Sequence, residues 1–158
     1  MKLRQATPGL LAIAVLITGC AQQMPEMPEI PFINPKLTDE DQVLRVLDEV
    51  WRGMQSKRIY QIMSNVSRSY KDRDGRDYDA LAAYLNTIFE EYRSIKIARA
   101  KPRVLVQGNQ ARALETFGTI AKPEPRSEYP PIDLHGQVSV YLEKVDGHWF
   151  IVEWGSIQ

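Results

Sequence analysis

The sequence is poor in cysteine and histidine and has no excess of charge of either sign, and each shortage excludes a class of protein. Lysine and arginine together number 20, as do aspartate and glutamate, so the chain has no net positive charge to attract nucleic acid or an anionic surface. One cysteine, Cys20, and two distant histidines, His135 and His148, are too few for a zinc site. The sequence also lacks a phosphate-cradling glycine loop and a serine nucleophile elbow, so it predicts no cofactor.

The apolar run at residues 10–17 is too short to span a bilayer, and its flanks indicate a targeting signal. Basic residues precede the run, and residues 17–20, Ile-Thr-Gly-Cys, resemble the lipobox of a bacterial lipoprotein signal. The resemblance implies that residues 1–19 are removed and that Cys20 is then lipidated, with palmitate among the expected chains. An ordinary secretory signal that ends near a chance cysteine is the alternative.

Residues 20–37 contain prolines every three or four positions, which favours an extended spacer over a helix. A proline-rich ligand for a partner is the alternative. Ala21, rather than an aspartate, follows the cysteine, and in the resembling lipoproteins this points to the outer membrane. The expected location is therefore the cell envelope, with a lipid anchor in the outer membrane and the domain facing the periplasm. With Cys20 consumed, the fold must be stabilised by burial without a disulfide.

Residues 38–158 are expected to form one domain that begins with three helices. Thr38 can cap a first helix whose apolar stripe includes Trp51. A second, shorter helix is expected over residues 57–67 and a third over about residues 77–92.

The apolar pattern then changes to the alternation typical of strands. One strand is expected over residues 94–107, bent or bulged at Pro102, and a second over residues 110–121. Residues 135–158 are expected to supply the last two strands as a hairpin.

The terminal hairpin has a strong turn signal, because Asp146-Gly147 favours the positive backbone dihedrals of a two-residue turn. If these two residues form the turn, Leu142 faces Ile151 and Val140 faces Glu153. Apolar groups occur on both faces of the ribbon, so the hairpin must lie within a larger sheet that packs against other elements.

Three helices followed by about four long antiparallel strands predict an α+β domain. The helices are expected to pack in the concave face of a curved, mostly antiparallel four-stranded sheet. Residues 38–158 resemble nuclear transport factor 2-like domains, the cone-shaped fold of ketosteroid isomerases and of polyketide cyclases of the SnoaL type. The resemblance rests on the first helix with Trp51, the short second helix, the loop at residues 70–75, the turn at Gly108-Asn109-Gln110-Ala111 and the closing Asp146-Gly147-His148-Trp149. It implies no activity, because enzymes, transport adaptors and assembly modules share this fold.

The loop at residues 71–77 alternates acidic and basic residues around Gly75. A calcium loop does not fit, because aligning Gly75 with the required glycine puts Tyr70 and Leu81 at the first and last ligand positions. The sequence therefore predicts a solvated turn.

Members of the resembling family that catalyse proton transfer place a carboxylate base and hydrogen-bonding acids, often tyrosine, inside the open end of the cone. Glu153 is the candidate base here, because it shares a predicted hairpin face with apolar residues, and Glu115 is a second candidate. A solvated rim position is the alternative for both. The residues expected to line a pocket, with simple core packing as the alternative, are Trp51, Tyr60, Tyr84, Tyr92 and Tyr141.

Because no complete catalytic set is present, the sequence favours a noncatalytic module that binds another envelope protein or a small apolar ligand. An isomerase, cyclase or hydrolase acting on an apolar substrate in the cone is the alternative. The expected partners include the lipid bilayer, through Cys20, and exclude nucleic acid. The family resemblance further implies a homodimer that forms through the sheet.

Overall fold

The computed structural model describes residues 37–158, so the predictions for the signal, for Cys20 and for the tether lie outside the described residues. The helices come first: α1 (Asp39–Ser56), α2 (Ile59–Met63) and α3 (Tyr78–Glu91). The strands follow: β1 (Tyr92–Arg99), β2 (Arg103–Gln107), β3 (Gln110–Pro123), β4 (Ile132–Val145) and β5 (His148–Trp154). Between residues 37 and 158, no helix is both long enough and apolar enough to cross a membrane.

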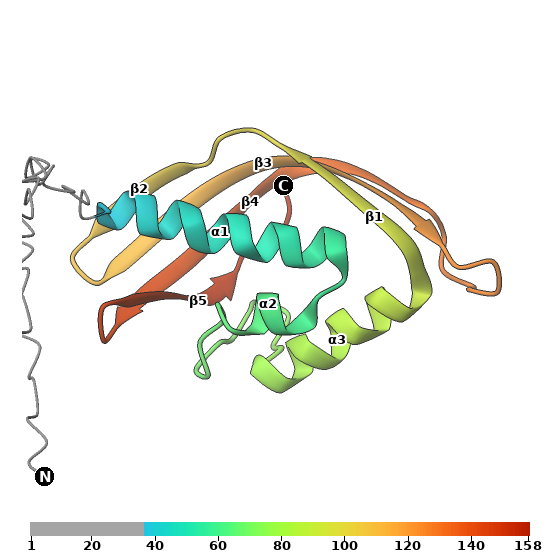
Figure 1. Cartoon of the computed structure of the whole chain (residues 1–158), viewed down its shortest axis with the longest axis horizontal. Helices are drawn as coiled ribbons and strands as arrows, with labels where there is room; N and C mark the ends of the chain where they lie inside the picture. The colour runs from blue at the N-terminus through green and yellow to red at the C-terminus, as the bar shows by residue number, and fades with distance from the viewer. Residues whose placement is uncertain (1–36) are drawn as a thin grey trace, which may run out of the picture. The chain divides into compact units, whose positions relative to one another are not determined.

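The strands form one antiparallel sheet that curves around the helices (Figure 1). The order is β1-β3-β4-β5, and β2 also pairs with β3. The strand expected over residues 94–107 is divided into β1 and β2, because the chain leaves strand geometry around Pro102, which cannot donate to a ladder. The helices lie on the concave face, so the predicted α+β architecture is confirmed.

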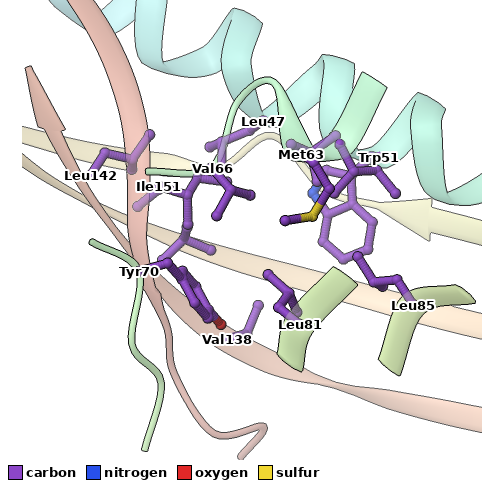
Figure 2. Packing of buried hydrophobic residues seen from close by; sticks show 14 of the residues in the cluster. Leu47, Trp51, Met63, Val66, Tyr70, Leu81, Leu85, Val138, Leu142 and Ile151 are labelled. Carbon is purple, nitrogen blue, oxygen red and sulfur yellow. The ribbon is translucent and has the colours of Figure 1, made fainter. Parts of the chain in front are cut away.

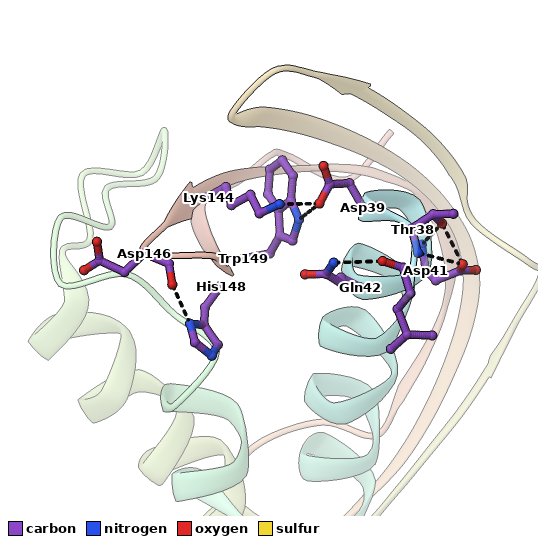
Figure 3. Close-up of polar contacts among 9 residues, drawn as sticks. Thr38, Asp39, Asp41, Gln42, Lys144, Asp146, His148 and Trp149 are labelled. Atoms are coloured by element: carbon purple, nitrogen blue, oxygen red, sulfur yellow. Dashed lines mark hydrogen bonds and ion pairs between the residues drawn. The ribbon is translucent and has the colours of Figure 1, made fainter. Parts of the chain in front are cut away.

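Helix α1 begins at the predicted Thr38 cap. The Thr38 hydroxyl accepts a hydrogen bond from the Asp41 backbone N–H at 3.1 Å, and the Asp41 carboxylate accepts one from the Thr38 N–H at 3.2 Å. Asp39 accepts from Nζ of Lys144 and from Nε1 of Trp149 on the terminal hairpin (Figure 3). The first helix is thereby tied to the last two strands.

Helix α2 ends at Met63, earlier than the expected residues 57–67, because the chain that follows pairs with β5. Ile151 donates its N–H to the Asn65 carbonyl at 2.8 Å, and Ser67 donates its N–H to the Ile151 carbonyl at 2.8 Å. These bonds cover part of the edge of β5 that would otherwise be exposed.

The hydrophobic core lies between the helices and the concave face of the sheet, as Figure 2 shows. Leu142 and Ile151 are 1% and 0% exposed and pair across the hairpin as predicted. Asp146 and Gly147 form the turn with φ values of 49° and 82°. Within residues 37–158, buried residues of the helices and the sheet form one shared hydrophobic core, which is what an independently folding domain requires.

A β-bulge at Val152 changes the register at the end of the hairpin. Tyr141 pairs with Glu153 and Val140 pairs with Trp154, so Val152 is an extra residue without a partner on β4. The insertion places Glu153 on the same face as Tyr141 and turns Trp154 towards the core. The predicted pairing of Val140 with Glu153 is therefore wrong, since alternation alone does not reveal a bulge.

Candidate functional site

A cavity of about 510 Å³ lies between the C-terminal half of α1, α3 and the concave face of the sheet. This volume is in the range of small-molecule sites. Its apolar lining includes Trp51, Met54, Ile88, Ile97, Phe117 and Val138. The cone is therefore open rather than filled by side chains, and its interior suits an apolar ligand.

The end of the chain forms one side of the cavity mouth. Beyond β5, Gly155 donates its N–H to the Ser139 carbonyl at 2.8 Å, and Gln158 donates its N–H to the Gln137 carbonyl at 2.9 Å. This pairing places Ile157 beside the cavity, where it forms an exposed apolar rim together with Leu134 of β4.

The loop after α2 also contributes to the lining of the cavity, and it supplies charged side chains. Asp72 is only 7% exposed and lines the cavity. Its Oδ1 accepts from the backbone N–H of Arg76 at 2.9 Å, and its Oδ2 accepts from Arg76 Nε at 2.8 Å. The hydroxyl of the buried Tyr70 also donates to Asp72 Oδ2, at 3.3 Å. The predicted solvated turn holds for Asp74, which is exposed, but is wrong for Asp72, because Arg76 folds back over it.

The electrostatics of this cluster do not favour proton transfer. Burial raises the pKa of Asp72, but the hydrogen bonds and charge of Arg76 outweigh burial and hold that pKa below its ordinary value. Burial and the adjacent Asp72 charge raise the pKa of Tyr70 well above its ordinary value. A general acid or base works best with a pKa near the working pH, and both shifts move these groups away from neutrality.

Glu115 is a second buried carboxylate, and it connects α1 to the sheet. The residue is 0% exposed, and both carboxylate oxygens accept from Trp51 Nε1 at 2.8 Å. Oε1 also accepts from Arg99 Nη1 at 2.9 Å, while Arg99 pairs with Asp48 of α1 as well. Burial raises the pKa of Glu115, and the bonds from Trp51 and Arg99 only partly oppose this shift. Because Glu115 does not line the cavity, the structure supports a structural link rather than a base.

Of the aromatic residues expected in a pocket, Trp51 and Tyr84 line the cavity and three others do not. Tyr60 is 88% exposed, because it lies on the side of α2 that faces away from the core. Tyr141 lies on the convex face, since its neighbours on β4 are buried and side chains alternate along a strand. Tyr92 is buried, and its hydroxyl donates to a carbonyl of the β3–β4 loop at 2.9 Å.

Glu153, the candidate base, lies outside the cavity. The bulge at Val152 turns it away from the concave face, and its Oε1 accepts from Arg73 Nε at 3.2 Å. The side chain that the sequence placed in an apolar setting is thus part of a half-exposed ion pair.

The cavity residues that sequence reasoning missed include Tyr70, Asp72 and Arg76, which are joined by hydrogen bonds. The available signal was a tyrosine next to a loop in which an arginine follows an aspartate by four residues. In the part of the chain that the structure describes, no group of three or more His, Cys, Asp or Glu side chains is arranged to hold a metal ion.

No protein-family model matches this chain, and no curated protein sequence matches it. Solved structures do match. A protein provisionally named a scytalone dehydratase, from Novosphingobium aromaticivorans, has a TM-score of 0.65 at 16% identity over 74% of this chain and 82% of its own. A provisionally named dehydratase of the nuclear transport factor 2-like family, from Streptomyces avermitilis, has a TM-score of 0.64 at 11% identity over 74% of this chain and 94% of its own.

A third match is a nuclear transport factor 2-like superfamily protein from Salmonella enterica. Its TM-score is 0.61 at 16% identity, over 72% of this chain and 85% of its own. Together these likenesses confirm that the domain has the nuclear transport factor 2-like cone fold. At such low identity they show the fold and no activity.

Proposed function

We propose that the domain is a noncatalytic binding module that takes a small apolar ligand into the cavity between α1, α3 and the sheet. The observation that carries the proposal is an apolar cavity of about 510 Å³ whose buried carboxylate, Asp72, is already neutralised by Arg76. Such a cavity can bury an apolar molecule, which stabilises the complex by roughly 25 cal/mol per Å² of apolar surface removed from water. The carboxylate is held in a fixed ion pair and is not free to take a proton from a substrate.

Binding of N-phenyl-1-naphthylamine tests this function. The dye is neutral and apolar, and its fluorescence rises when it leaves water. Titrating it into the purified domain, residues 37–158, is expected to give a saturable rise that fits a single site. A rise that is only linear with dye concentration would show nonspecific partition and would contradict the proposal.

We also propose that the chain is anchored by lipid on Cys20 in the outer membrane, with the domain in the periplasm. The lipobox pattern at residues 17–20 supports this. In bacteria fed labelled palmitate, the full-length protein is expected to take up label and to sediment with outer membranes on a density gradient. The Cys20→Ser variant is expected to do neither. Equal labelling of both forms would exclude Cys20 as the attachment site.

A second candidate function is an enzyme that uses the Tyr70–Asp72 pair for acid–base chemistry. The position of this pair at the cavity supports the idea, as do the two similar structures that are provisionally named dehydratases. Turnover of an apolar substrate by the wild-type domain, lost in both Asp72→Asn and Tyr70→Phe, would establish this candidate over the noncatalytic one.

A further inference from the structure

The guanidinium of Arg76 is held in a fixed orientation at the cavity mouth. Its Nε donates to Asp72 Oδ2 at 2.8 Å, and its Nη2 donates to Asp74 Oδ2 at 2.5 Å. Its Cζ lies 4.8 Å from the centre of the Tyr84 ring, which also lines the cavity. A guanidinium fixed on several sides loses little further freedom when it binds a ligand.

Part of this guanidinium remains available to a ligand. Arginine has five N–H donors. Among residues 37–158, Nη1 of Arg76 has no hydrogen-bond acceptor, whereas both oxygens of Asp72 already accept hydrogen bonds. Nη1 of Arg76 can therefore donate to an acceptor on a ligand, whereas Asp72 is already engaged by Arg76 and Tyr70.

The charges that line the cavity cancel. Asp72 and Asp74 are balanced by Arg73 and Arg76. A carboxylate ligand would lose hydration at the mouth without gaining a net positive field, whereas a neutral acceptor loses less. Other lining residues, among them Leu134 and Ile157, are apolar, so a ligand can bury hydrocarbon against them and in the rest of the cavity.

We propose that the ligand is a neutral amphiphile, whose hydrocarbon part fills the cavity and whose ester or ketone oxygen accepts a hydrogen bond from Nη1 of Arg76. This inference rests on the proposed binding function and specifies the chemistry of its ligand. It distinguishes an acyl ester from a free fatty acid, which carries the same hydrocarbon with a charged head.

Competition against N-phenyl-1-naphthylamine tests the inference with two probes of equal chain length, methyl dodecanoate and dodecanoate. At neutral pH, the wild-type domain is expected to bind the ester more tightly than the carboxylate. In Arg76→Met, ester affinity is expected to fall by about tenfold, the size of a lost hydrogen bond to a charged donor. Loss of Arg76 also leaves Asp72 without its ion-pair partner, so the affinity of the dye, which has no oxygen acceptor, is expected to fall by less than the ester affinity. Saturable dye binding by the variant shows that the cavity remains folded.

Two neighbouring variants serve as controls. Arg73→Met removes a cavity-lining arginine whose Nε already pairs with Glu153, and ester affinity is expected to stay unchanged. Asp74→Asn removes one exposed negative charge, and it is expected to raise dodecanoate affinity relative to the ester. Because Asp74 is exposed, this variant tests the charge balance even if Arg76→Met does not fold.

Tighter wild-type binding of dodecanoate than of the ester would overturn the inference. So would an equal loss of ester affinity in Arg73→Met and Arg76→Met, or an unchanged preference in Asp74→Asn. The proposed function can survive each of these results, because the dye would still bind. If neither the dye nor either dodecyl probe binds the wild-type domain, the proposed function itself fails, and this inference fails with it.

Discussion

Replacing Glu115 with alanine is expected to lower the free energy of unfolding by about 3 kcal/mol, because it leaves a buried donor without its acceptor and breaks one of the ion pairs of Arg99. The change leaves the Trp51 indole N–H without its acceptor and removes one of the two carboxylates that bind Arg99. Both bonds lie where α1 meets the sheet, so their loss weakens the joint between the two layers. Urea denaturation followed by circular dichroism measures the effect.

Glu143→Ala is the matched control, because Glu143 is exposed on β4 of the same sheet. Substitutions at such exposed positions usually change stability by less than about 0.5 kcal/mol. If Glu115→Ala and Glu143→Ala destabilise the domain equally, Glu115 is not the structural link that its contacts indicate.

Glu115 also makes the free energy of unfolding depend on pH. Burial raises the pKa of Glu115 above its ordinary value of 4.5, so the folded chain takes up this proton at a higher pH than the unfolded chain. The contribution of Glu115 to stability therefore grows as the pH falls from the folded pKa towards 4.5 and declines as the pH rises. Glu115→Gln, which keeps an acceptor for Trp51, is expected to lack this dependence.

Replacing Thr119 with tryptophan is expected to remove saturable binding of N-phenyl-1-naphthylamine. Thr119 lies on the concave face of β3 and lines the cavity, so an indole at this position occupies the volume that a ligand needs. Fluorescence titration of the variant domain, with circular dichroism to confirm that it is folded, measures the loss.

Ile120→Trp provides the control from the next position on the same strand. Because strand side chains alternate, Ile120 lies on the convex face, where it is exposed. This variant is expected to bind the dye as the wild type does. Equal binding by Thr119→Trp and the wild type would show that the dye does not use the cavity.

The parts of the fold that depend on local sequence could be predicted from the chain alone. Thr38 caps α1 because its hydroxyl accepts a hydrogen bond from a free N–H group at the start of the helix. The three acidic residues of the first turn suit the positive end of the helix dipole. Asp146-Gly147 forms the turn, and the pairing of Leu142 with Ile151 follows directly from it.

The candidate site could not be predicted, because it depends on contacts between distant elements. The bulge at Val152 has no local signal, yet it turns Glu153 out of the cavity and Trp154 into it. Asp72 is buried because the loop folds against β5, where Lys71 donates its N–H to the Val152 carbonyl at 3.0 Å. The alternating charges of residues 71–77 do not predict that contact.

Other predictions remain open to experiment. The lipid on Cys20 and the proline-rich tether lie outside residues 37–158. The homodimer through the sheet also stays a prediction. On the convex face, polar residues such as Arg112, Thr116 and Gln137 are exposed, so a dimer there would have to bury many polar groups.

An NMR titration of the ¹⁵N-labelled domain with N-phenyl-1-naphthylamine tests whether a ligand binds inside the cone. Amide signals are expected to shift on α3, β1 and β3 around the cavity, at Ile88, Ile97 and Thr119. The signals of Arg112 and Gln137 on the convex face are expected to stay in place. Shifts confined to the convex face, or no saturable shift anywhere, would contradict a ligand site inside the cone.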